Sequence, residues 1–206
     1  KRKKTESMKK TISIIISIAM CAMLASCGDV KNEVSDTEQP TLIDTMSLEE
    51  KVGQILFVRC VEDGQTDDLM SIKPGGILMF GRDFEGLTKD EVKEKIQSYQ
   101  DKSDIPLIIG ADEEGGTVVR ASANPHLRAD KFPAPQALYA AGGLSALRGD
   151  AAEKSSFLLG LGVNVNFAPV CDVSTDPGDY IYPRTLGAPA EETAEYVSAV
   201  VTRFYA

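Results

Sequence analysis

The sequence lacks an excess of basic residues, and it contains a single histidine. Lysine and arginine number 22 against 31 acidic residues, which gives a net charge of −9 and a pI near 4.7. We therefore expect no basic surface for nucleic acid. His126 is the only histidine, and it follows Asn124 and Pro125 in a segment rich in loop formers. We interpret it as a surface histidine.

Cysteine is also scarce, with four residues in the whole sequence. Cys60 and Cys171 each follow an apolar, strand-like run, and they share no spacing typical of a metal site. Buried free thiols are therefore expected rather than a disulfide or a metal pair. The sequence indicates no metal site and no cofactor.

No apolar run reaches the length of a confident membrane span. The longest, Thr11–Leu24, follows Lys9 and Lys10 and is shorter than the ~20 residues that a bilayer requires. A basic start, a short apolar segment and small residues after it predict a secretory signal, with Met8 as an initiator-like residue. A retained anchor is the alternative.

The end of this segment, Leu24-Ala25-Ser26-Cys27, resembles the lipobox of bacterial lipoproteins. The resemblance implies cleavage before Cys27 and lipid attachment there, and hence an extracytoplasmic, membrane-anchored bacterial lipoprotein. The alternative is an ordinary signal with a chance cysteine. Residues 28–46 are polar and have no periodic apolar face, which predicts a flexible tether. We therefore divide the chain into residues 1–27 (including those upstream of Met8), 28–46 and 47–206.

Strand and helix patterns alternate four times after residue 47. Buried strands are expected at residues 54–58, 77–80, 107–111 and 162–170. Helical patterns start after Ser47, at residue 66, after Thr88, at residue 144 and near residue 190, and the first should turn Leu48 and Val52 inward. This order predicts an α/β fold with a parallel sheet, either doubly wound or part of a (β/α)₈ barrel. A whole barrel takes about 250 residues, so the barrel alternative implies a fragment with about four βα units, truncated at its C-terminal end.

Three acids and two glycines end the third predicted strand. The run Asp112-Glu113-Glu114-Gly115-Gly116 comes directly after the apolar residues 107–111. In parallel sheets and barrels ligands bind at the carboxyl ends of the strands, so this cluster is a candidate site. A solvated turn is the alternative. The two glycines are expected to permit positive φ or a close backbone approach.

Several ordered motifs resemble glycoside hydrolase family 3. Residues 112–120, DEEGGTVVR, are similar to its D-x-E-G-G-x-V-x-R signature. Residues 160–173, GLGVNVNFAPVCDV, resemble its G-I-N-x-N-x-A-P-V-x-D-V strand, and residues 181–187, IYPRTLG, its I-x-x-R-x-F-G loop, with Leu186 where phenylalanine is usual. The resemblance implies the N-terminal half of a (β/α)₈ barrel over residues 47–206, and the E-G-G form is similar to the β-N-acetylhexosaminidase branch.

The resemblance also implies an activity. Family members release terminal β-linked sugars, here N-acetylhexosamine such as N-acetylglucosamine, by a retaining mechanism through a glycosyl–aspartate intermediate. Carried over by position, Asp112, Arg120 and Arg184 would bind the terminal sugar. Asp172 is either a further pocket residue or a loop anchor, and Glu114 is expected to anchor the glycine turn or a nearby basic group. The chain contains no match for the acid/base histidine or for the nucleophilic aspartate, so no catalytic residue is expected in it.

Two other interpretations remain open from sequence. One is a lipid-anchored sugar-binding protein without hydrolytic activity, because such proteins also combine a lipobox, a polar tether and parallel α/β lobes. The other is an inactive relative of the family. In each case the expected partners are a carbohydrate, in particular β-N-acetylglucosaminides that could come from cell walls, and a membrane reached through the lipid anchor.

Overall fold

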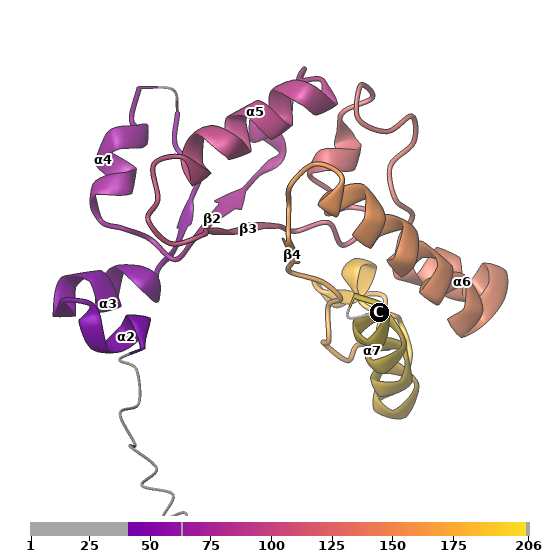
Figure 1. Ribbon diagram of the computed structural model, residues 1–206. Coiled ribbons are helices and arrows are strands. Elements are labelled where there is room, and N and C mark those ends of the chain that lie inside the picture. Colours follow the sequence, from indigo (N-terminus) through magenta and orange to yellow (C-terminus); the bar gives the residue numbers. More distant parts are fainter. Residues whose placement is uncertain (1–40, 63, 205–206) are drawn as a thin grey trace, which may run out of the picture. The chain divides into compact units, whose positions relative to one another are not determined.

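The computed structural model describes residues 41–62 and 64–204 (Figure 1). The predicted signal, Cys27 and the tether as far as residue 40 lie outside these residues. Residues 42–45, at the end of the predicted tether, form the short helix α2 (Leu42–Thr45). No helix within the described ranges is both long and apolar enough to cross a membrane.

Four parallel strands form the sheet, in the order β1-β2-β3-β4. Their bounds are β1 (Phe57–Arg59), β2 (Gly76–Met79), β3 (Ile108–Ala111) and β4 (Val165–Asn166). The register pairs Arg59 with Leu78, Met79 with Ala111, and Ala111 with Asn166, so all four strands end at one edge. This confirms the predicted α/β fold with a parallel sheet.

Helices follow each strand in turn (Figure 1). They are α4 (Thr66–Ser71) after β1, α5 (Lys89–Gln100) after β2, α6 (Pro135–Leu159) after β3 and α7 (Ala190–Phe204) after β4. Three short 3₁₀ helices lie in the loops, namely η1 (Gly81–Asp83), η2 (Ala121–Ala123) and η3 (Tyr182–Arg184). Non-helical backbone at Gly142 and Gly143 divides α6 into two helical segments. The second segment begins at residue 144 as predicted, and the first, from Pro135, was not expected from the sequence.

The helix before the sheet, α3 (Leu48–Gln54), shows where an interpretation was wrong. The helix starts after Ser47 as predicted, and a capping box begins it: the Ser47 hydroxyl accepts from the Glu50 N–H and the Glu50 carboxylate accepts from the Ser47 N–H. However, Leu48 and Val52 are 72% and 49% exposed instead of buried. The helix also takes up Gln54, so the first strand begins only at Phe57.

Two apolar clusters hold these elements together. The larger one packs β2 and β3 against α4, α5 and the end of α6, and its fully buried members include Ile77, Met79, Ile109 and Val92. The inner face of α5 carries Val92, Ile96 and Tyr99, which are buried. The smaller cluster joins α6 and α7 through Leu147, Ala151, Leu186, Ala188, Tyr196 and Val200.

The opposite face of the sheet carries two phenylalanines over glycine. Phe57 of β1 and Phe167, the residue after β4, meet edge-on with their ring centroids 5.1 Å apart. In a flat sheet their strands would lie three spacings of ~4.8 Å apart, about 14 Å. The Phe57 ring reaches across this distance by lying over Gly76 and Gly110. We call this side of the sheet the phenylalanine face. A side chain at Gly110 would collide with both rings, because its Cβ would lie 2.7 Å from Phe167 and 2.8 Å from Phe57.

Candidate functional site

The residues at the carboxyl ends of the strands form the candidate site. Arg59 ends β1, Phe80 follows β2, Asp112 follows β3, and Asn166 ends β4. Because the strands are parallel and in register, these four residues reach the same edge of the sheet. This is the edge at which α/β folds bind ligands.

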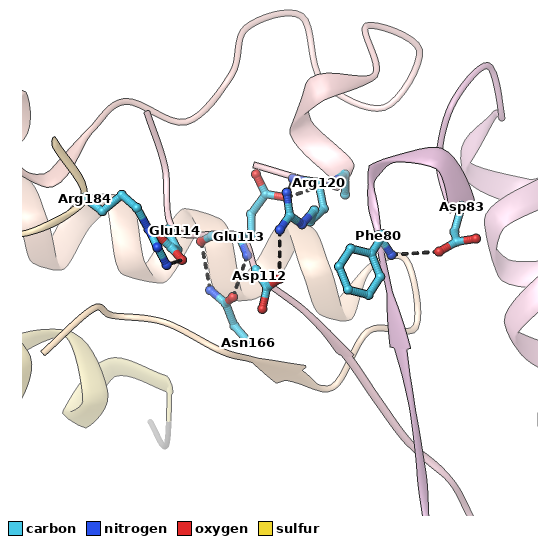
Figure 2. Close-up of polar contacts among 9 residues, drawn as sticks. Phe80, Asp83, Asp112, Glu113, Glu114, Arg120, Asn166 and Arg184 are labelled. Carbon is cyan, nitrogen blue, oxygen red and sulfur yellow. Dashed lines mark hydrogen bonds and ion pairs between the residues drawn. The ribbon is translucent and has the colours of Figure 1, made fainter. Parts of the chain in front are cut away.

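Asp112 and Arg120 form an ion pair at this edge (Figure 2). Asp112 Oδ2 accepts from Arg120 Nη2 at 2.9 Å, and the side chains are 23% and 25% exposed, so solvent or a ligand reaches both. Phe80 packs beside them, with its ring centroid 5.4 Å from Arg120 Cζ, and Arg59 stacks on the same ring at 4.6 Å. Arg120 Nε is buried and has no hydrogen-bond partner among the described residues. A donor is therefore left over beside a partly exposed carboxylate.

The Glu113 carboxylate holds the loop that carries Arg120 through its backbone. The side chain is fully buried, and its Oε2 accepts from the backbone N–H groups of Arg120 at 3.0 Å, Ala121 at 2.8 Å and Ser122 at 3.3 Å. The Ser122 hydroxyl donates to Oε1 at 2.5 Å. Four donors thus satisfy one buried carboxylate that no cation neutralises in the described structure. The loop following Val119 is thereby fixed to the end of β3.

Strand β4 holds Glu113 from the other side. The Asn166 side chain accepts from the Glu113 N–H at 2.9 Å and donates to the Glu113 carbonyl at 3.1 Å. Asn164 acts in the same way lower in the sheet, since its Oδ1 accepts from the Ile109 N–H at 2.8 Å. The side chains of the two asparagines thus extend the β3–β4 ladder.

Glu114 binds Arg184 through two parallel hydrogen bonds (Figure 2). Arg184 Nε and Nη2 donate to the two carboxylate oxygens at 2.9 and 2.7 Å, and the Glu114 side chain is only 5% exposed. The hydrogen bonds that Arg184 donates to Glu114 raise the pKa of its guanidinium above the ordinary value. This confirms the expectation that Glu114 anchors a nearby basic group.

The loop that carries Arg184 is fixed to α6. Gln136 in the first turn of α6 donates from Nε2 to the Tyr182 carbonyl at 2.7 Å. Asp172 is exposed, and its negative charge makes a smaller contribution to the raised pKa of Arg184. Asp172 therefore lies on the Arg184 side of the site. This position is compatible with both predicted roles, a pocket residue or a loop anchor.

The two glycines of the motif form the turn between these ion pairs. Gly115 and Gly116 both have positive φ, 104° and 67°, and a Cβ on Gly115 would lie 2.3 Å from the Pro133 carbonyl oxygen. Both predicted reasons for glycine, positive φ and close approach, are confirmed. The turn sends Glu114 toward Arg184 and the following residues back toward Arg120.

The structure thus places all three predicted sugar-binding residues at one edge of the sheet, in two separate ion pairs. Asp112 binds Arg120, whereas Arg184 binds Glu114. His126 is exposed, as expected for a surface histidine. Sequence reasoning missed Phe80, although its position directly after a buried strand is equivalent to that of Asp112.

The cysteine predictions are only half right. Both are free, and Cys60 is buried, which raises the pKa of its thiol. Cys171 is exposed, because the predicted fourth strand ends at Asn166 and the residues after it lie in a loop. Within the described ranges, no cluster of three histidine, cysteine, aspartate or glutamate side chains could hold a metal ion.

Comparisons with known proteins place this site in a family. Residues 47–204 match the model of the glycosyl hydrolase family 3 N-terminal domain. No curated protein matches the chain. The chain is similar to a family 3 β-N-acetylglucosaminidase from Paenibacillus sp. str. FPU-7, with a TM-score of 0.70 and 29% identity, over 78% of this chain and 31% of that one.

Two further solved structures are similar. A fungal multi-domain family 3 β-N-acetylglucosaminidase has a TM-score of 0.66 and 29% identity, over 77% of this chain and 19% of that one. NagZ from Neisseria gonorrhoeae, solved with N-trifluoroacetyl-D-glucosamine, shares the fold, with a TM-score of 0.59 and 20% identity, over 72% of this chain and 46% of that one. The chain spans less than half the length of each of the three. Since the family model matches most of its residues, the chain belongs to glycosyl hydrolase family 3.

Proposed function

We propose that this chain forms the terminal-sugar side of the active site of a hydrolase that releases terminal β-linked N-acetylhexosamine, in particular N-acetylglucosamine. The Asp112–Arg120 pair carries the proposal, because it is partly exposed at the carboxyl edge of the sheet. The description of the Paenibacillus and fungal neighbours as β-N-acetylglucosaminidases supports the choice of sugar.

The geometry suits the recognition of sugar hydroxyl groups. Asp112 uses Oδ2 for Arg120, and its other oxygen is available as an acceptor. Hydrogen bonds from hydroxyl groups to a carboxylate contribute about 1.5–3 kcal/mol each. Arg184 is held rigidly by Glu114, so its remaining N–H groups can donate without loss of side-chain order. Phe80 offers an apolar wall beside these polar groups, as ligand pockets commonly do.

The chemical step is proposed to be retaining and to use groups beyond this chain. A retaining glycosidase needs a nucleophile and a proton donor on either side of the scissile bond. Glu113 and Glu114 are committed to loop and arginine contacts, which argues against either as that pair. We therefore propose that the chain is the N-terminal half of a (β/α)₈ barrel, and that the acid/base histidine and the nucleophilic aspartate belong to its other half.

The experiment is hydrolysis of a chromogenic N-acetyl-β-D-glucosaminide by the complete protein, with the matched β-glucoside as a control substrate. We expect the first product to be the β-anomer by NMR. Asp112→Asn should lower kcat/KM at least tenfold with an unchanged circular dichroism spectrum, whereas Asp130→Asn, an exposed acid in the next loop, should not.

Two results would count against the proposal in different ways. Tight binding of N-acetylglucosamine in calorimetry without hydrolysis would favour the sugar-binding alternative. Wild-type kinetics in Asp112→Asn would remove Asp112 from the pocket.

We also propose, from the sequence, that the protein is a lipoprotein anchored outside the cytoplasm. The support is the lipobox-like Leu24-Ala25-Ser26-Cys27 after a short apolar segment. Incorporation of labelled palmitate, and its loss in Cys27→Ser, tests this proposal. Unlabelled wild-type protein would favour an ordinary signal.

A further inference from the structure

A buried lysine outside the proposed sugar pocket contacts the turn that carries Glu114. Lys154 lies on α6 and is only 6% exposed. Its ammonium group lies 2.9 Å from the Asp150 carboxylate, one helical turn earlier, and donates to the Glu114 carbonyl at 3.0 Å. It also lies 5.1 Å from the centroid of the Phe132 ring. The buried ammonium group of Lys154 therefore lies close to a carboxylate, a backbone carbonyl and an aromatic ring.

Packing alone does not account for a charge in this place. Removing an ammonium and a carboxylate from water is unfavourable, and apolar residues of similar volume often replace a buried ion pair without loss of stability. An apolar residue cannot, however, donate to the Glu114 carbonyl. Without Lys154 this buried acceptor would lose the donor that the structure provides.

The carbonyl of Glu114 matters because of the side chain on the same residue. The Glu114 N–H donates to the Val118 carbonyl at 3.0 Å, and its carbonyl accepts from Lys154. With both backbone groups fixed, the side chain has a defined direction toward Arg184, whose two hydrogen bonds require it.

The surrounding space argues against a direct role for Lys154 in binding. Glu114, Asp150, Lys154 and Tyr196 line a cavity of about 10 Å³, which is the size of a water molecule and not of a sugar. Burial, with smaller contributions from Asp150, Cys171 and Glu114, raises the pKa of the Tyr196 hydroxyl well above its ordinary value, so this residue stays neutral here.

We infer that Lys154, with Asp150, is a positioning residue for Arg184, and that it acts through the Glu114 peptide. The inference rests on the proposed function, in which Arg184 binds the terminal sugar. It assigns to helix α6 a share in substrate affinity, although no α6 side chain reaches the Asp112–Arg120 pair through a described hydrogen bond or ion pair.

The test uses the complete protein and the double variant Lys154→Met with Asp150→Ala, which removes both charges so that neither is left unpaired. We expect KM for the chromogenic N-acetyl-β-D-glucosaminide to rise at least fivefold, with kcat within twofold of the wild type. The single variant Lys154→Arg keeps a donor and a positive charge, so its KM should stay close to that of the wild type. Lys131→Met, at an exposed lysine, is the matched control.

Two further measurements separate positioning from general loosening. In an Arg184→Ala background the double substitution should add no further rise in KM, because the group that it positions is gone. Exchange of the Arg184 Nε proton, followed by NMR, should be at least tenfold faster in the double variant than in the wild type.

These measurements distinguish failure of the inference about Lys154 from failure of the proposed function. A wild type that neither cleaves nor binds N-acetylglucosamine would overturn the proposed function, while proton exchange at Arg184 would still decide whether Lys154 positions it. An active wild type, together with a double variant of unchanged KM and unchanged exchange, would overturn the inference.

Discussion

Three consecutive carboxylates after β3 have three different environments. Asp112 is partly exposed and binds a side chain, Glu113 is buried and binds a loop backbone, and Glu114 is buried and binds Arg184. The three side chains thus bind different groups although they are adjacent in the sequence. Neighbouring acids in this run therefore have different roles: one is accessible to a ligand and the next supports the structure. The presence of a carboxylate alone does not identify the functional residue.

Glu113 offers the sharpest prediction at this scale. Glu113→Ala leaves the N–H groups of Arg120, Ala121 and Ser122 without their acceptor, so we expect the free energy of unfolding to fall by about 3 kcal/mol. Glu113→Gln keeps an acceptor oxygen for these groups and can donate to Ser122 Oγ, so it should cost less than about 1 kcal/mol. Urea denaturation measures both. Equal losses in the two variants would show that charge, rather than acceptor geometry, holds the loop.

The sequence predicted the site residues better than their partners. Asp112, Arg120 and Glu114 could be placed at one edge because a motif follows a buried strand directly. The link between Glu114 and Arg184, however, joins residues 70 positions apart. Lys154, which donates to the Glu114 carbonyl, lies on helix α6, 40 positions after Glu114. No local pattern in the sequence indicates this partner. Such partners depend on how helices cross the strand ends, which local pattern does not contain.

Among the elements, α3 explains why a periodic pattern can mislead. Its apolar Leu48 and Val52 are exposed, and the helix is held instead by polar and backbone contacts on another face. The Gly53 carbonyl accepts from the Gly75 N–H at 3.1 Å, and Gln54 Nε2 donates to the Lys73 carbonyl at 3.0 Å. Gly53 is buried at this contact. A side chain on Gly53 would prevent the close approach of the two backbones. Capping residues were predictable here, since caps depend on neighbours in sequence, whereas the buried face was not.

Substitution of Gly53 tests this account. In Gly53→Ala the new Cβ would lie 2.2 Å from the Ile72 carbonyl oxygen and 2.6 Å from that of Lys73, so backbone must move. We expect a loss of about 2 kcal/mol in the free energy of unfolding. Gly149→Ala in α6 meets nothing within 4 Å and should gain about 0.5–1 kcal/mol from helix propensity. A neutral Gly53→Ala would show that α3 docks loosely.

At the scale of the whole molecule, the sheet has two outer edges without a strand partner in the described structure. β1 pairs only with β2, and β4 only with β3. The phenylalanine face between them is apolar, with Ile108 46% and Phe167 47% exposed. Unpaired parallel edges beside an exposed apolar face favour association with other chains. The proposed barrel would cover both features within one polypeptide.

This arrangement predicts how the 206-residue chain behaves when it is expressed alone. We expect association that increases with concentration in light scattering, because chains can cover one another's phenylalanine faces. Ile108→Lys places a charge on that face and should lower the associated fraction at least twofold. Ile43→Lys adds the same charge at a site that is 66% exposed on α2, away from the strands, and should leave association unchanged. If both lysines act equally, net charge controls association. If neither acts, the phenylalanine face is not the surface through which the chains meet, and the case for a partner half that closes the sheet loses its physical support.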